Sequence, residues 1–172
     1  RYGTVTGVQT CALPIFAASP DGQTAIVGYE DGGLDIWTDR DTRRISDIPS
    51  SGAYPGISRI ERVVFASENR AFAATGFGVV EINLTYGVIQ GTYLLRSDGG
   101  TTPCYDLSLE GDSLFVASES GLWSVHLQDP LYLPASWKQS SYWADVPLGH
   151  VATLPEAKLV HPWSDGSVWM SV

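Results

Sequence analysis

The hydrophobic positions of this chain recur in short runs separated by turn residues. Four segments share one pattern, in which an apolar run of small residues, a short turn containing glycine and a second apolar run follow one another. They cover residues 25–37, 71–82, 114–125 and 158–172. Short runs with such boundaries predict pairs of β-strands, and no stretch shows the longer period of an amphipathic helix.

The four segments are evenly spaced. Aligned on a shared glycine, they place Gly33, Gly78, Gly121 and Gly166 at separations of 45, 43 and 45 residues. A repeat near 44 residues with short strands is typical of β-propeller blades, each of which is a four-stranded sheet. We expect the shared glycine to allow the tight turn between the second and third strands of each blade.

The sequence around each pair supplies the remaining strands. "ISRIERVVFASEN" and "PCYDLSLEGDS" precede the second and third pairs, and "TRRISDI", "GVIQGTYLL" and "SYWADV" predict outer strands. We expect the small-residue runs "AFAAT" and "LFVAS" to lie nearest the propeller axis, and the apolar runs that follow them to fill the layers between blades.

The predicted fold class is all-β, a partial β-propeller of about three to four four-stranded blades. The approximate blades are residues 16–50, 57–96, 102–146 and an incomplete 147–172. Because propellers typically have four to eight blades, we expect these residues to be a piece of a longer protein.

The first fifteen residues do not share the blade pattern. "VTGVQTCALPI" back-translates into the standard adapter that is ligated to DNA fragments for short-read sequencing, and the reading frame holds from Arg1 to the start of Phe16. We therefore expect residues 1–15 to be an adapter-derived, non-native segment. Such a segment is excluded from fold reasoning, and Cys11 with it.

Composition narrows the function classes. The 19 acidic residues outnumber the 10 lysines and arginines, which gives a net charge of −9. Nucleic acid is a poor partner for such a chain, because phosphate contacts require lysine and arginine. No apolar run is long enough to span a membrane. The 18 glycines and 10 prolines suit a fold with many turns.

The candidate chemistry is sparse. His126, His150 and His161 lack the spacing of metal ligands, and Cys104 has no basic neighbour that would activate its thiol. The acidic turns "YEDGG" and "WSDGS" belong to distant blades, so turn chemistry explains them better than calcium binding. We expect no catalytic residue, metal or cofactor, and we expect Cys104 to be a small buried hydrophobic residue.

One aromatic cluster is a candidate partner contact. Trp137, Lys138, Tyr142 and Trp143 lie in a stretch whose prolines predict an exposed connection. Aromatic residues beside a cation are typical of protein interfaces. The alternative is that these aromatic side chains cover the edge of a blade.

Three stretches carry a resemblance to a known family. "GGLDIWTDRDTRRISDIP", "GFGVVEINLTYGVIQGTYLLRSDGG" and "LFVASESGLWSV" followed by "LYLPASW" resemble, in this order, the PorZ-type propeller proteins of the type IX secretion system. The resemblance covers residues 25–137 and is most specific at residues 76–93. "LLRSDGG" departs from the family's I-G-x-x-G pattern.

The resemblance implies a non-enzymatic protein at the outer-membrane surface or in the periplasm of a Bacteroidetes-like bacterium. Such proteins assist a sortase-like component that attaches cargo to anionic lipopolysaccharide. The implied partners are proteins of this attachment complex, with lipopolysaccharide bound through parts outside these residues. The family has two propellers and a small C-terminal β domain, and it offers no catalytic residue to carry over.

Two other functions remain open at this point. A periplasmic sensor propeller of a hybrid two-component regulator has shorter repeats that carry the motif "D-G-x-L-W-x-G-T". The stretch "SESGLWSV" matches this motif in part. A propeller enzyme needs carboxylates or metal ligands aimed into the central channel, and the small side chains expected there argue against it. The fold alone does not decide, because propellers host all three functions.

Overall fold

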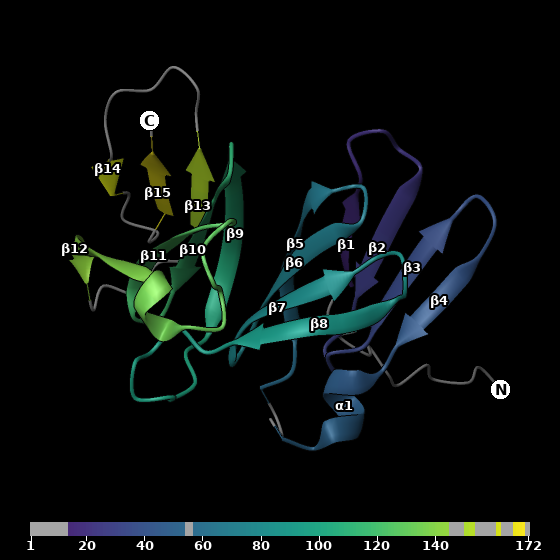
Figure 1. The fold of residues 1–172 in the computed structure, drawn as a ribbon, viewed down its shortest axis with the longest axis horizontal. Coiled ribbons are helices and arrows are strands. Elements are labelled where there is room, and N and C mark those ends of the chain that lie inside the picture. Colours follow the sequence, from purple (N-terminus) through teal and green to yellow (C-terminus); the bar gives the residue numbers. More distant parts are fainter. Residues whose placement is uncertain (1–13, 54–56, 145–149, 154–160, 163–166, 171–172) are drawn as a thin grey trace, which may run out of the picture.

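The computed structural model describes residues 14–53, 57–144, 150–153, 161–162 and 167–170, and from residue 142 onward it describes the backbone alone. Three four-stranded antiparallel sheets follow one another along the chain, each with its strands in sequence order (Figure 1). The first sheet comprises β1 (Ile15–Ala18), β2 (Thr24–Gly28), β3 (Leu34–Thr38) and β4 (Thr42–Ile45).

The second sheet comprises β5 (Ile60–Ser67), β6 (Arg70–Thr75), β7 (Gly78–Asn83) and β8 (Val88–Tyr93), and the third comprises β9 (Cys104–Glu110), β10 (Ser113–Ser118), β11 (Gly121–His126) and β12 (Lys138–Ala144). A smaller sheet has the order β13 (His150–Thr153), β15 (Ser167–Met170), β14 (His161–Pro162), in which β13 and β15 are parallel. The predicted fold class, an all-β partial propeller, is confirmed.

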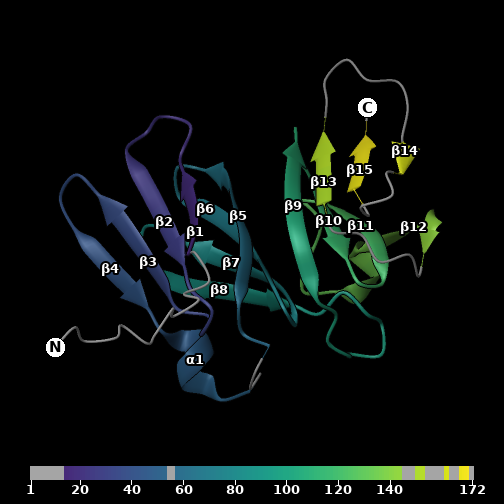
Figure 2. The ribbon, with the colours of Figure 1, turned by 180° about the vertical axis from the view of Figure 1, so that it is seen from behind.

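The first strand of each sheet lies innermost. β1 contacts β5, β5 contacts β9 and β9 contacts β13, so these four strands form the inner edge of the assembly (Figure 2). "AFAAT" and "LFVAS" instead form most of β6 and β10, the second strands. The expectation that these small-residue runs lie nearest the axis is wrong. Small side chains serve here to let neighbouring sheets approach closely on both faces.

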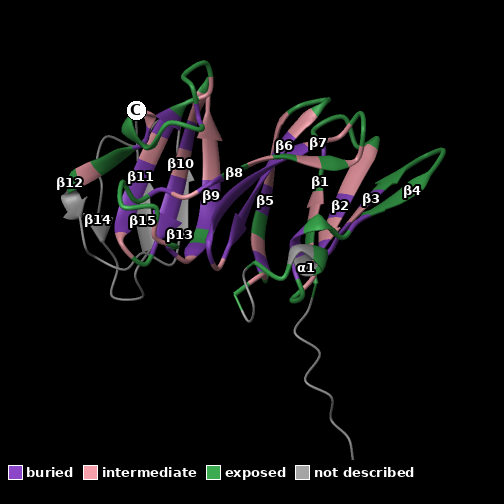
Figure 3. Ribbon diagram, turned by 60° about the horizontal axis from the view of Figure 1, so that its bottom comes forward, coloured by how far each residue is buried: buried purple, intermediate pink, exposed green. Residues whose placement is uncertain are grey.

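The layers between sheets hold the core. In β6, Ala71 and Ala73 face the first sheet, whereas Phe72 and Ala74 face the third. β7 alternates in the same way, with Val80 in one layer and Val79 in the other. Successive side chains of a strand point to opposite faces, so a strand buried on both sides is apolar throughout. The prediction that these runs fill the layers between blades is confirmed (Figure 3).

Glycine at the start of the third strand has the predicted backbone role in two sheets. Gly78 has φ 155° and Gly121 has φ 109°, values that disfavour other residues. The turns are alike, because the hydroxyls of Thr75 and Ser118 each donate a hydrogen bond of 2.8 Å to the carbonyl of that glycine. In the first sheet the left-handed residue is Gly32, with φ 86°, one residue before the aligned position.

Two short helical segments were not predicted. The helix α1 (Asp47–Ser51) follows β4 and ends at Gly52, which is left-handed, and its Ile48 is buried in the layer between the first two sheets. The 3-10 helix η1 (Pro134–Ser136) precedes β12. Both are too short for hydrophobic periodicity to reveal them. Within the described ranges, no helix has the length and apolar character that a membrane crossing requires.

Candidate partner-binding surface

The buried side chain of Trp137 holds the connection between β11 and β12 against the third sheet. Its side chain is 4% exposed, and its Nε1 donates a hydrogen bond of 2.9 Å to the carbonyl oxygen of Leu131. Leu131 is buried as well, so this segment folds back onto the third sheet. The burial of Trp137 fits the alternative role considered from the sequence, the covering of a blade edge, and leaves little indole surface for a partner.

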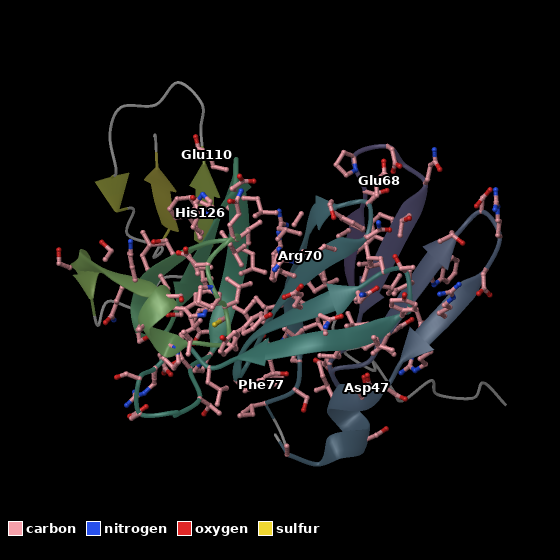
Figure 4. The ribbon with its side chains drawn as sticks, viewed as in Figure 1. Asp47, Glu68, Arg70, Phe77, Glu110 and His126 are labelled. Carbon is pink, nitrogen blue, oxygen red and sulfur yellow. The ribbon has the colours of Figure 1, made fainter. Side chains whose placement is uncertain are left out.

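Polar side chains cross the layer between the second and third sheets. The Arg70 guanidinium donates to both carboxylate oxygens of Glu81, at 2.8 and 3.2 Å, and to the carbonyl oxygen of Leu127 at 3.5 Å. The Tyr93 hydroxyl donates a short hydrogen bond to Glu81. Figure 4 shows Arg70 pointing into the space between these sheets. A buried carboxylate needs such partners, because burying it unpaired is costly.

Neither the spacing nor the resemblance singled out this network. The available signal was Glu81 itself, a carboxylate within the apolar run "GFGVVEI". A charged residue in a strand buried on both faces must find a partner. Its partner Arg70 begins β6 opposite Asn83, so the strand pairing places it diagonally across from Glu81 at the open end of the hairpin formed by β6 and β7.

Exposed side chains near Trp137 form the candidate surface. Tyr132 is 76% exposed, Leu133 is 44% exposed, and Lys138 is exposed at the start of β12. We call these three residues the β12 surface. Tyr142 and Trp143 lie further along β12, but their side chains lie outside the description. A partner contact at Lys138, Tyr142 and Trp143 therefore stays a prediction.

Cys104 and His126, two residues with potential for chemistry, lie in different surroundings. Cys104 is fully buried, and this burial raises the pKa of its thiol well above the ordinary value, which opposes nucleophilic attack. His126 is exposed, and its Nδ1 accepts a hydrogen bond from the Gln128 amide at 3.4 Å. In the described part of the chain, no cluster of histidine, cysteine and carboxylate side chains could hold a metal ion.

The Asp-Gly turn of the first sheet is built as predicted. The Asp31 carboxylate accepts a hydrogen bond of 2.8 Å from the Gly33 amide, so it stabilises its own turn. Arg44 lies 3.6 Å from Asp31 and 3.2 Å from Asp35. Asp31 and Asp35 therefore have a cationic partner within their own sheet. "WSDGS" lies partly outside the described residues.

Comparison with known proteins agrees with this architecture. The family described as "TSS9, PorZ, N-terminal beta-propeller domain" matches residues 1–138. Among solved structures, PorZ of Porphyromonas gingivalis, described as an essential bacterial surface component of the type IX secretion system, aligns with a TM-score of 0.62 at 23% identity. The alignment covers 73% of this chain but only 16% of the PorZ chain.

Other propellers share the fold without sequence similarity. The computationally designed Ika4 protein aligns with a TM-score of 0.62 at 12% identity, covering 93% of this chain and 90% of its own. The WD40 propeller domain of Doa1 aligns with a TM-score of 0.54 at 12% identity, covering 88% of this chain and 44% of its own. The comparison with curated proteins gives no match.

The designed and WD40 propellers establish the fold alone, whereas the family match covers most of the chain and includes the Gly76–Tyr93 stretch that carried the resemblance. The chain belongs to the family of PorZ N-terminal β-propeller domains of the type IX secretion system.

Proposed function

We propose that this chain is part of a non-catalytic propeller scaffold in the type IX secretion and attachment machinery. In this role it assists the sortase-like component that attaches cargo to anionic lipopolysaccharide, at the outer-membrane surface or in the periplasm. The observation that carries the proposal is the family match over residues 1–138.

The chemistry of the described residues supports a binding role. The buried Glu81 carboxylate pairs with the half-buried Arg70 across β6 and β7, and the buried Asp106 carboxylate pairs with Arg62. Carboxylates and rings that hold sheets together are not free to take part in proton transfer. The β12 surface offers two apolar side chains and one cation, which suits a protein partner.

The test is a deletion in the source bacterium of the codons for residues 16–138, in frame. If the proposal is right, cargo proteins should accumulate with their C-terminal signals uncleaved, and less cargo should reach the cell surface. Immunoblots of periplasmic and surface fractions measure both quantities. Normal cleavage and surface attachment in the deletion strain would contradict the proposal.

Sequencing the gene outward from residues 16–172 separates the alternatives. A second propeller and a small β domain downstream would support the secretion role. A membrane helix followed by a kinase domain would favour the sensor propeller instead. The same reads test the prediction that residues 1–15 derive from an adapter, since genomic sequence continuous with that segment would contradict it.

A further inference from the structure

A groove of about 430 Å³ lies between the first two sheets, at the end where their inner hairpins turn. One wall is the turn between β1 and β2, with residues from 19–24, and the other is the turn between β5 and β6, with residues from 65–68. Figure 4 shows Glu68 at this end of the molecule, beside the turn between β1 and β2. The volume lies within the range of pockets that bind small ligands or peptide side chains.

The groove combines apolar side chains with two carboxylates. Pro20, Phe65 and Ala66 supply apolar surface, while Asp21 and Glu68 are exposed acidic residues, one on each wall. Hydroxyls along the same walls can accept or donate hydrogen bonds. Apolar surface with a few polar groups is the usual make-up of a binding groove.

Both carboxylates lack a cationic partner within the described ranges. Asp21 accepts hydrogen bonds from the Ser19 hydroxyl at 2.5 Å and from the Gln23 amide at 3.0 Å, which fix its position in the turn. The Ser19 hydrogen bond is the main cause that lowers the pKa of the Asp21 carboxyl, so it stays ionised. Two arginines of the neighbouring strands are committed elsewhere, Arg62 to Asp106 and Arg70 to Glu81.

The groove is longer than a single pocket. A second hollow of about 330 Å³ adjoins it, because Pro20 and Phe65 line both. This hollow runs along the inner strands β1 and β5, past Val63 and Val64. The combined groove therefore leads from two exposed carboxylates onto a floor of mixed apolar and polar surface, to which the Arg62 side chain contributes. Such a floor suits an extended chain rather than a single ion.

We propose that this groove binds an extended protein segment in which lysine or arginine side chains alternate with apolar side chains. The cations pair with Asp21 and Glu68, and the apolar side chains cover Pro20 and Phe65. The net charge of −9 favours the approach of a cationic segment. The same charge disfavours an anionic ligand in this groove. The proposal does not depend on the proposed secretion role.

Fluorescence anisotropy with the 172-residue chain tests the proposal. The probe is an acetylated, fluorescein-labelled hexapeptide in which lysine alternates with leucine, and the control peptide carries glutamate in place of lysine. We expect the lysine peptide to bind and the glutamate peptide not to bind. Glu68→Gln should weaken binding roughly two- to fivefold, the loss expected for one exposed ion pair, and Asp21→Asn should act similarly.

Glu119→Gln is the matched control variant. Glu119 is an exposed glutamate in the turn between β10 and β11, at the other end of its sheet, and the substitution removes the same charge. Equal weakening of peptide binding by Glu68→Gln and Glu119→Gln would overturn the proposal, because it would show that net charge alone explains the effect. Amide chemical shifts should change at residues 19–24 and 65–68 on peptide binding, and changes confined to other strands would also overturn it.

Discussion

The ring of Tyr93, at the end of the second sheet, lies 5.9 Å from the ring of Trp137, which directly precedes the outer strand of the third. The two rings are tilted by 42°, within the range of favourable aromatic pairs. Each ring also has a polar tether, Tyr93 to Glu81 and Trp137 to the carbonyl of Leu131. This pair therefore joins the edges of two sheets that share no backbone hydrogen bonds.

Trp137→Ala should destabilise the chain by about 3–4 kcal/mol, because it removes a buried indole and leaves a cavity between two sheets. The matched control is Trp37→Ala in β3, where the side chain is 52% exposed and the expected loss is about 1 kcal/mol or less. Urea unfolding followed by circular dichroism measures both. Similar losses for the two variants would contradict the structural role of Trp137.

Arg70→Met should cost about 2–3 kcal/mol of unfolding free energy, because it leaves the buried Glu81 carboxylate without its cation. This expected loss is at or below the smallest losses that breaking a buried ion pair causes, because the Arg70 side chain is 30% exposed. The double variant with Glu81→Gln should lose less than the sum of the two single losses. A double-mutant cycle measured by urea unfolding tests this, and strict additivity would contradict the pairing.

Stability should fall at alkaline pH through Tyr93. Burial, with the hydrogen bond to Glu81, raises the pKa of the Tyr93 hydroxyl well above its ordinary value of 10. The folded state then keeps a proton that the unfolded state loses, so this contribution is present below about pH 10 and declines above it, by up to about 1.4 kcal/mol per pH unit.

Tyr93→Phe removes this titration. At about pH 8 the variant should be less stable than the parent chain by about 1 kcal/mol, the value of one hydrogen bond. The difference in unfolding free energy between the two chains should narrow between about pH 10 and pH 11, because only the parent chain loses stability through the titration of this residue. Urea unfolding across this pH range measures the difference, and a constant gap would contradict the assignment.

Gly78→Ala should be costly, about 2 kcal/mol or more. Its φ of 155° disfavours an alanine, and the added Cβ would lie against the carbonyl oxygen of Tyr93. Gly22→Ala is the control, since Gly22 has φ 71° but no atom within 4 Å of an added Cβ. Its expected cost is about 1 kcal/mol, from the backbone alone. Thermal unfolding of both variants separates backbone strain from the steric contact.

Cys104 should resist thiol reagents in the folded chain. It is fully buried and its thiol pKa is raised, so little thiolate is present at neutral pH. A Cys11→Ser chain leaves Cys104 as the remaining thiol. We expect slow reaction with Ellman's reagent in buffer and fast reaction in urea. Rapid labelling without denaturant would show that the third sheet opens readily.

Much of the fold could be predicted because each sheet is built from strands close in sequence. The spacing of Gly78 and Gly121 located two of the turns that the structure shows, and β4, β8 and β12 overlap the stretches in which outer strands were predicted. The first sheet uses Gly32 rather than Gly33 because its turn is longer. A pattern of spacing reveals that a turn exists but does not fix which glycine takes the left-handed conformation.

The site was harder to predict because it depends on contacts between sheets. The cluster around Trp137 was visible in the sequence, but its burial follows from the ring of Tyr93 and the carbonyl of Leu131. The groove with Asp21 and Glu68 could not be predicted from the sequence, since these residues are 47 positions apart. They line one groove only because the hairpins β1–β2 and β5–β6 lie side by side. Periodicity describes one strand at a time and carries no information about such neighbours.

The burial of β6 and β7 on both faces has a consequence for strand alignment. A strand with one polar face is fixed against slippage, because a shift of one residue would expose its apolar side chains. In β6 such a shift would exchange Phe72 and Ala74 for Ala71 and Ala73, which exposes no apolar side chain but moves the Phe72 ring into the other layer. The alignment must then be held by features that cannot move, namely the turn at Gly78 and the pairing of Arg70 with Glu81. The pairing of Arg70 with Glu81 thus helps to determine which of the two apolar faces of this hairpin meets each neighbouring sheet.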